Sequence, residues 1–148
     1  MSERTALKRD LLTEAEGLVA SDAPDEEVVG GVVRLVHEAH PSWDWSGIYL
    51  LTGGVLVLGP STAPADHDRI EVGEGVCGTA VSEDKNQVVE DVREVENYLA
   101  CSIHTRSEIV GQFDLDSDTV GAFTSEDEAM LEELAGIIAP RVAALAAS

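Results

Sequence analysis

Apolar residues recur every three or four positions in the N-terminal part of the chain, the spacing that places them on one side of an α-helix. One series predicts a helix that stops before Ser21, and a second predicts a helix from about Pro24 to just before Pro41. Gly30 and Gly31 weaken the second helix by about 1 kcal/mol each relative to Ala, and this pair indicates close contact with another helix. The buried sides are expected to contain Leu7, Leu11, Leu12, Ala15, Leu18 and Val19 in the first helix and Val28, Val29, Val32, Val33 and Val36 in the second.

From Trp45 onward the pattern changes to alternation and short apolar runs, which are typical of strands. Residues 47–51 and 55–58 predict a hairpin with a two-residue turn, Gly53-Gly54. The segments expected next are a polar loop at 61–68, short strands at 69–72 and 87–89, and a loop or single helical turn at 93–98.

The C-terminal part predicts a half-exposed strand and a long helix. Residues 108–116 alternate apolar and acidic positions. The helix is expected to begin at Thr124 or Ser125, each with an acid three residues later in capping-box spacing, and Pro140 is expected to kink it. Its buried residues are expected to be Met130, Leu131, Leu134, Ile137, Ile138 and Leu145. The order of elements indicates an α+β fold, an antiparallel sheet with N-terminal and C-terminal helices packed on it, in a single domain over residues 1–148.

The chain is strongly acidic, with 29 acidic and 9 basic residues among 148 and a formal net charge of −20. This charge repels nucleic-acid phosphates and anionic membranes, so neither is expected as a partner. A hydrophobic content of 44% excludes a disordered acidic tail, so the acids are expected to coat a folded surface. With Lys8 and Lys85 as its lysines, the composition resembles that of proteins from salt-loving archaea, in which high ionic strength screens self-repulsion. An ordinary acidic cytosolic protein is the alternative.

The N-terminal residues lack the apolar segment of a signal peptide, and no apolar run approaches the roughly 20 residues that a membrane helix needs. The protein is therefore expected to be cytoplasmic, with its two cysteines reduced. Cys77 and Cys101 lie 24 residues apart, and no close pair of Cys or His supplies further ligands, so no metal site is expected.

The stretch 73–108 contains both cysteines and begins with two glycines that allow a tight turn close to a ligand. Cys77 follows in a loop that leads into a short helix, with a buried, unreactive thiol as the alternative interpretation. Cys101 is expected at a loop-to-strand junction open to solvent. There the nearby His104 and Arg106 favour the thiolate, which is the reactive form.

Seven short motifs follow one another between residues 40 and 135. They are WSGIY at 45–49, LGP at 58–60, GEGVCGTA at 73–80, QVVEDV at 87–92, AC at 100–101, SEIV at 107–110 and DLD at 114–116. In this order they are far more specific than any one of them alone. The chain resembles the free methionine-R-sulfoxide reductases, single-domain enzymes of the GAF superfamily. The resemblance implies a GAF-type fold, reduction of free methionine-R-sulfoxide, a homodimer and no cofactor.

The resemblance also implies residue roles. The Cys101 thiolate is the nucleophile that attacks the sulfoxide sulfur, methionine leaves, and a sulfenic acid remains. Cys77 is the possible resolving thiol, and a thioredoxin-like donor completes the cycle. Acids hold the substrate ammonium and deliver a proton to the sulfoxide oxygen, and an aromatic wall contacts the methyl-sulfoxide end. These residues are Glu108, Asp114 and Asp116 for the acids, and Trp45 and Tyr49 for the wall. Without the resemblance, the acids are solvated surface and the aromatic residues are core.

Three departures from the family leave a second interpretation open. His67 stands where family members carry a third cysteine, and Ser102 stands where they carry Asp. About ten residues with a polar turn are missing after Val110, so a neighbouring strand edge is expected to be unpaired. On one straight strand Glu108 and Asp116 are eight residues apart, about 26 Å at 3.3 Å per residue, too far to meet one small ligand. Unless the strand bends, the alternative is a GAF ligand-binding or sensory module without chemistry.

Overall fold

The computed structural model describes residues 3–39, 43–63, 69–71, 87–89, 97–105, 108–117 and 123–147. In chain order the elements are α1 (Glu3–Ala20), α2 (Asp25–Glu38), β1 (Trp45–Thr52), β2 (Val55–Ser61), β3 (Arg69–Glu71), β4 (Gln87–Val89), β5 (Asn97–Thr105), β6 (Glu108–Ser117) and α4 (Ser125–Ala147). The strands form one sheet in the order β3-β2-β1-β6-β5-β4, and every neighbouring pair is antiparallel. The predicted α+β class with an antiparallel sheet is confirmed.

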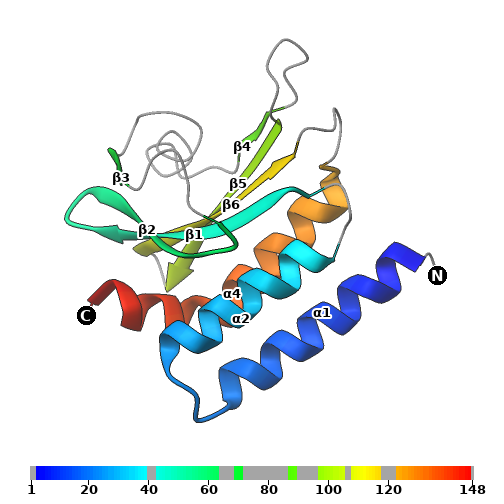
Figure 1. Cartoon of the computed structure of the whole chain (residues 1–148), viewed down its shortest axis with the longest axis horizontal. Helices are drawn as coiled ribbons and strands as arrows, with labels where there is room; N and C mark the ends of the chain where they lie inside the picture. Colours follow the sequence, from blue (N-terminus) through cyan, green and yellow to red (C-terminus); the bar gives the residue numbers. More distant parts are fainter. Residues whose placement is uncertain are drawn as a thin grey trace.

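All three described helices lie on one face of the sheet (Figure 1). Helix α2 packs on β1 and β2, and α4 packs on β5, β6 and β1. Helix α1 packs on α2 and α4 and forms an outer layer. None of the helices in the described ranges is long and apolar enough to cross a membrane.

The core lies between the sheet and the α2–α4 layer. All five valines predicted for the buried side of α2 are buried, and Leu11 and Ala15 of α1 pack against the same cluster. Four of the residues predicted for the last helix, Met130, Leu131, Leu134 and Ile138, are buried, and Ile137 and Leu145 pack at the margin of the core. The 3.6-residue period therefore identified the helix faces correctly, because burial of one apolar side is what fixes a helix against a sheet.

The last helix begins with a reciprocal cap between Thr124 and Asp127. The Thr124 backbone N–H donates to Asp127 Oδ2 (2.9 Å), and the Asp127 N–H donates to Thr124 Oγ1 (3.3 Å). These bonds satisfy backbone donors that the first turn of a helix leaves without partners. The capping box is the one predicted from Thr124, and the helix itself starts at Ser125.

Arg141 ties α4 to the connection between α1 and α2. Its guanidinium donates to the backbone carbonyls of Val19 (3.0 Å), Ser21 (2.6 Å) and Ala23 (2.9 Å). It also forms an ion pair with Asp25 Oδ1 at 2.8 Å. Carbonyls at the end of α1 lack donor partners within the helix, and the partly buried guanidinium of Arg141 supplies them while joining α4 to α1.

Two sequence predictions about the region around Cys101 are wrong. Residues 97–105 form the long strand β5, where the sequence predicted a loop or turn up to residue 98 and a junction at Cys101. The expected unpaired edge is absent from Gly111 to Asp116, where β1 pairs with one side of β6 and β5 with the other, and the part before Gly111 pairs with β5 alone. β6 therefore forms a hairpin with β5, the strand that precedes it.

A β-bulge interrupts this hairpin near its tip. Ile103 pairs with Gly111, whereas the next residue, His104, pairs with Ile109, so Val110 is an extra residue in β6. A bulge shifts the alternation of side chains by one. Val110 accordingly packs with the helix-side core, and Ile109 packs with Tyr49 on the opposite side.

Candidate functional site

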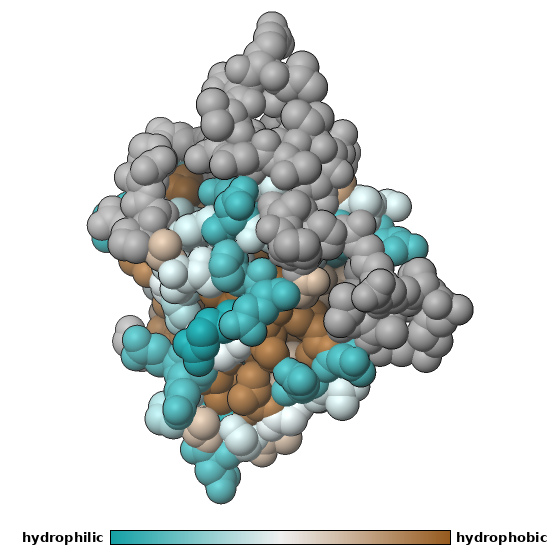
Figure 2. Space-filling view, turned by 45° about the vertical axis from the view of Figure 1, so that its right-hand side comes forward, coloured by the Kyte–Doolittle hydropathy of each residue, from teal (hydrophilic) through white to brown (hydrophobic). Residues whose placement is uncertain are grey.

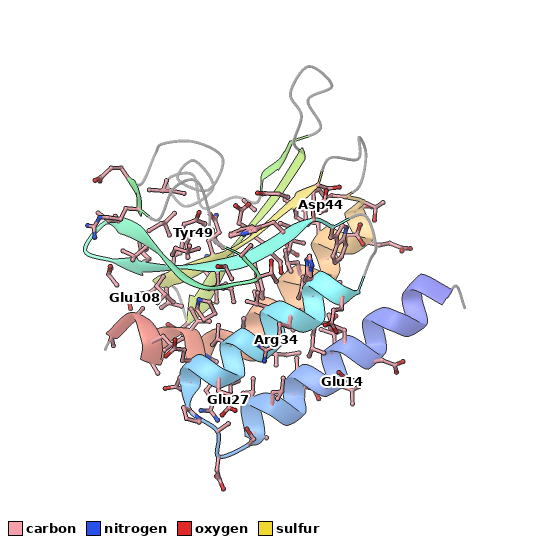
Figure 3. All side chains as sticks on the ribbon, in the orientation of Figure 1. Glu14, Glu27, Arg34, Asp44, Tyr49 and Glu108 are labelled. Carbon is pink, nitrogen blue, oxygen red and sulfur yellow. The ribbon has the colours of Figure 1, made fainter. Side chains whose placement is uncertain are left out.

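The face of the sheet turned away from the helices, called the distal face below, gathers residues from β1, β5 and β6. Alternate residues of each strand lie on this face because the side-chain period of a strand is two. The strand register arranges them in rows: Tyr49, Gln112 and Ser102 in the first, Gly47, Asp114 and Ala100 in the second, and Trp45 and Asp116 in the third. Tyr49 lies on the side of the sheet opposite the helices in Figure 3.

Four of the predicted site residues meet on the distal face. Trp45 is directly opposite Asp116, and Tyr49 lies one row beyond Asp114. Directly opposite residues have Cβ atoms about 5 Å apart, and successive rows are about 7 Å apart. Tyr49 and Asp114 are buried and Asp116 is partly buried. Two carboxylates and two aromatic rings therefore lie within the span of one small molecule.

Trp45 is fixed in place by a glycine beside it in β1. A Cβ at Gly47 would lie within van der Waals contact distance of the Trp45 ring, 2.9 Å from its Cζ2 atom. The indole therefore lies over the Gly47 backbone, and its Nε1–H donates to the carbonyl of Ala63 at 2.8 Å. A side chain at position 47 would push the ring aside, so Gly47 sets the orientation of one wall of the site.

Gln112 and Ser102 also lie on the distal face, and sequence reasoning missed both as site residues. They are directly opposite each other on β6 and β5. Gln112 has the same strand parity as Asp114 and Asp116, and this alternation was the signal that could have found it. Both side chains are buried, and neither has a hydrogen-bond partner among the residues that the structure describes.

Cys101 is on the other face of the sheet, contrary to the prediction of a solvent-open, thiolate-prone residue. It belongs to the helix-side core, opposite Phe113, with 1% of its surface exposed. Burial raises the pKa of the Cys101 thiol from 9.0 to about 12, and the carboxylates of Glu132 and Glu128 add to the rise. The thiol donates to the backbone carbonyl of Ser102 at 3.8 Å. In this position Cys101 is a small core residue with almost no thiolate at neutral pH.

Glu108 does not join the other acids. It lies exposed at the start of β6, near the C-terminal part of α4 in Figure 3, and the whole of 108–117 is one strand. The bulge at Val110 also turns Glu108 to the face opposite to that of Asp114 and Asp116. Of the other sequence candidates, Cys77, His67 and Arg106 lie outside the described residues.

Within the described ranges, no three side chains of the His, Cys, Asp and Glu types cluster closely enough to hold a metal ion. Asp114 and Asp116 are successive acids of one strand face, and the residues opposite them on β1 are Gly47 and Trp45, which offer no further side-chain oxygen. Two carboxylates on one strand face can bind an organic cation or transfer a proton.

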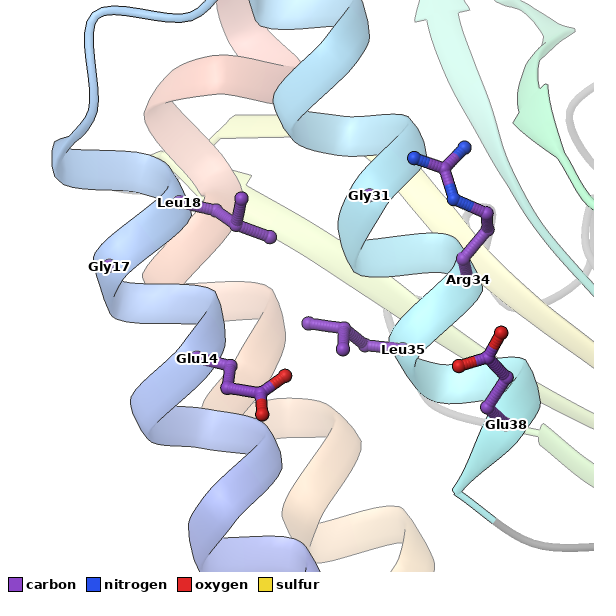
Figure 4. Close-up of a pocket in the computed structure, with 7 residues that line it drawn as sticks. All are labelled: Glu14, Gly17, Leu18, Gly31, Arg34, Leu35 and Glu38. Atoms are coloured by element: carbon purple, nitrogen blue, oxygen red, sulfur yellow. The ribbon is translucent and has the colours of Figure 1, made fainter.

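A separate hollow of about 500 Å³ lies between α1 and α2, on the helix side of the sheet (Figure 4). Its lining consists of Glu14, Gly17, Leu18, Gly31, Arg34, Leu35 and Glu38. A Cβ at Gly31 would come within 3.3 Å of the Leu18 side chain, which confirms the predicted close helix contact at this glycine. In the space-filling view, hydrophobic residues reach the surface between hydrophilic ones in the lower half of the molecule (Figure 2). None of the predicted site residues lines this hollow.

The fold and the distal face define the class of protein. Residues 24–142 match the family model of the GAF domain, so the chain belongs to the GAF domain family.

Relatives within this family point to a particular chemistry. The free methionine-R-sulfoxide reductase of Escherichia coli is 36% identical over 141 residues, covering 88% of this chain and 86% of the relative. A solved structure of the free methionine-R-sulfoxide reductase from Neisseria meningitidis in complex with its substrate superposes with a TM-score of 0.86 at 28% identity, covering 99% of this chain and 95% of the other. A relative from Dictyostelium discoideum, GAF domain-containing protein A, is 34% identical over 84% of this chain and 85% of its own length. The relatives therefore include proteins that are named as reductases and one that is named only for its GAF domain.

Proposed function

We propose that this GAF domain binds free methionine-R-sulfoxide on the distal face and reduces it to methionine. The observation that carries the proposal is the convergence of Trp45, Tyr49, Asp114 and Asp116 on one face of the sheet. The named reductases among the relatives, one of them solved with its substrate, support the choice of ligand.

Each of the four residues has a part in this proposal. Asp114 holds the α-ammonium of the substrate, because a buried carboxylate binds a cation more strongly than an exposed one does. The ring of Trp45, opposite Asp116, contacts the apolar methyl-sulfoxide end, and the ring of Tyr49 forms the wall two rows away. Asp116, opposite Trp45, delivers a proton to the sulfoxide oxygen as the S–O bond breaks.

The reaction also needs a thiolate, and the proposal assigns it to Cys77. Cys101 faces the helix core with a pKa of about 12, and Cys77 is the other of the two cysteines in the chain. The Cys77 thiolate attacks the sulfoxide sulfur, the oxygen passes to the cysteine, and methionine leaves a cysteine sulfenic acid behind. A dithiol such as a thioredoxin-like protein reduces the sulfenic acid, giving back the thiol, a disulfide in the donor, and water. Cys101 takes no part in this cycle.

The test is turnover of racemic free methionine sulfoxide by the purified chain with dithiothreitol in molar potassium chloride, followed by chiral chromatography. Stereospecific loss of the R form is the expected result, abolished in Cys77→Ser and retained in Cys101→Ser. The Cys101 variant is the matched control, because both variants remove one thiol. Loss of activity in Cys101→Ser with retention in Cys77→Ser would contradict the assignment of the thiols.

A second candidate function is ligand binding without chemistry. The burial of Cys101 on the helix side favours it, since the resemblance gives the nucleophilic role to that residue. Binding of methionine sulfoxide in a calorimeter without loss of the R form under any thiol donor is the outcome that selects this function over the reductase.

A further inference from the structure

Gln112 is a polar residue in a position where proteins place apolar ones. It is fully buried, with 0% of its surface exposed, and both its amide oxygen and its amide nitrogen lack a hydrogen-bond partner among the residues that the structure describes. Leaving such a group without partners costs about 1–3 kcal/mol of folding stability. Few buried polar groups in native proteins are left in this state, and each one calls for a physical reason.

A second side chain of the same kind lies directly beside it. Ser102, opposite Gln112 on β5, is buried, and its hydroxyl also lacks a partner within the described part of the chain. Tyr49 is the opposite neighbour of Gln112 on β1, and Asp114 follows one row away, at about 7 Å along the strand. The amide of Gln112 and the hydroxyl of Ser102, both without hydrogen-bond partners in the described part of the chain, thus form one polar cluster next to the carboxylate of Asp114.

The chemistry of this cluster complements that of the acids. Asp114 is negative and selects a cation, whereas the amide Nε2–H₂ of Gln112 and the hydroxyl of Ser102 are neutral donors that can bind an anion. An α-amino acid carries an ammonium and a carboxylate on the same carbon, so its two charges fit neighbouring rows of one strand face.

We propose that Gln112 and Ser102 bind the α-carboxylate of a free amino acid whose α-ammonium is held by Asp114. This inference rests on the proposed function for the place of the ligand, but not for its sulfur chemistry. It fixes the orientation, with the head of the amino acid at the first two rows and its side chain directed along the sheet toward Trp45 and Asp116. Gln112 has no exposed surface in this structure, so binding requires a rearrangement of the groups around it. The site then excludes methionine sulfoxide within a peptide, which has no free α-carboxylate unless it is C-terminal.

The test compares free L-methionine-R-sulfoxide with its α-carboxamide, which keeps the ammonium and the sulfoxide but lacks the carboxylate charge. Titration calorimetry of the whole chain in molar potassium chloride is expected to give at least tenfold tighter binding of the acid, because hydrogen bonds to a charged group are the stronger ones. In Gln112→Leu with Ser102→Ala the ratio of the two dissociation constants should fall to about one. Equal binding of acid and amide by the unchanged protein, or an unaltered ratio in the double variant, overturns the inference.

Thermal unfolding supplies a readout that does not depend on the ligand. Ser102→Ala removes a hydroxyl without a partner and should leave the melting temperature unchanged or raise it. Ser46→Ala is the matched control, because Ser46 is equally buried but donates to the carbonyl of Val33 at 2.9 Å, so its loss should lower the melting temperature. Gln112→Leu should raise the melting temperature as well. A fall of several degrees in both Gln112→Leu and Ser102→Ala would show that the two side chains serve the fold, and would refute a ligand-binding role.

The outcomes also separate this inference from the proposed function. Preference for the acid over the amide without any turnover supports the amino-acid site and refutes the reductase. Turnover of sulfoxide with no discrimination between acid and amide removes the amino-acid site and keeps the reductase. If neither compound binds at millimolar concentration, both the amino-acid site and the reductase function are refuted.

Discussion

Alkylation of the native protein should leave Cys101 almost unmodified, and the size of the effect follows from its position in the core. Iodoacetamide reacts with the thiolate, so its rate is proportional to the ionised fraction. With the pKa of Cys101 raised from 9.0 to about 12, the thiolate fraction at pH 8 falls from about one tenth to about one in ten thousand. The lower ionised fraction alone should therefore reduce the native rate about 1000-fold relative to the unfolded chain, and burial reduces access further.

The measurement uses Cys77→Ser, so that all alkylation reports on Cys101. Mass spectrometry follows the mass increase with time in native buffer and in concentrated urea at the same pH. Modification of the native variant at more than a hundredth of the unfolded rate would contradict the buried position of Cys101, and with it the assignment of the attack to Cys77.

The same pKa predicts how stability depends on alkaline pH. The folded state holds the neutral thiol more tightly than the unfolded state does, so this contribution is fully present below pH 9 and is lost as the pH rises toward 12. Between pH 8 and pH 10 it removes on the order of 1 kcal/mol from the free energy of unfolding. Urea titrations at the two pH values should show this loss in the parent chain and a smaller one in Cys101→Ala. An identical loss in both would refute the reasoning.

Three further predictions concern the charge and the sheet. Because salt screens the repulsion within a chain of net charge −20, its melting temperature should rise from dilute buffer to molar potassium chloride. A flat or falling trend would contradict the interpretation that the protein is adapted to salt. Gly111→Ala should cost about 2–3 kcal/mol, because its Cβ would lie 3.0 Å from the Val142 side chain and closer still to the carbonyl of Tyr49. Gly136→Ala, with no atom within 4 Å of the added Cβ, should instead gain about 1 kcal/mol, and chemical denaturation distinguishes the two. Insertion of about ten residues with a polar turn after Val110 should lower the melting temperature, because it separates Glu108 and Ile109 from their pairing with β5, and a rise would contradict this.

The helices and most strands were predicted correctly from the sequence. The prediction failed for β5, which was expected to be a loop or turn followed by a junction at Cys101. Between residues 97 and 105, Leu99, Cys101 and Ile103 alternate with smaller or more polar residues, which is the pattern of a strand with one buried face. The Ala-Cys motif was instead placed at a loop-to-strand junction, because it comes shortly before the alternating residues that begin at Ser107. The local alternation carries the physical information here, since burial of every second residue is what stabilises β5 against α4.

The candidate site was predictable to the extent that strand parity determines it. Asp114 and Asp116 share a face because they are two residues apart, and pairing with β1 adds Trp45 to them. The position of Glu108 was not predictable, because a bulge is set by tertiary packing rather than by a local sequence signal. The raised pKa of Cys101 could likewise not be predicted from the sequence, since the main cause of the rise is desolvation beneath α4.

The bulge divides β6 into two parts that are held differently. From Gly111 to Asp116 the strand is clamped between β1 and β5, whereas the part before the bulge pairs with β5 alone. A change of length ahead of residue 111 therefore alters only the pairing with β5 and leaves the two aspartates on the part of the strand that both neighbours hold.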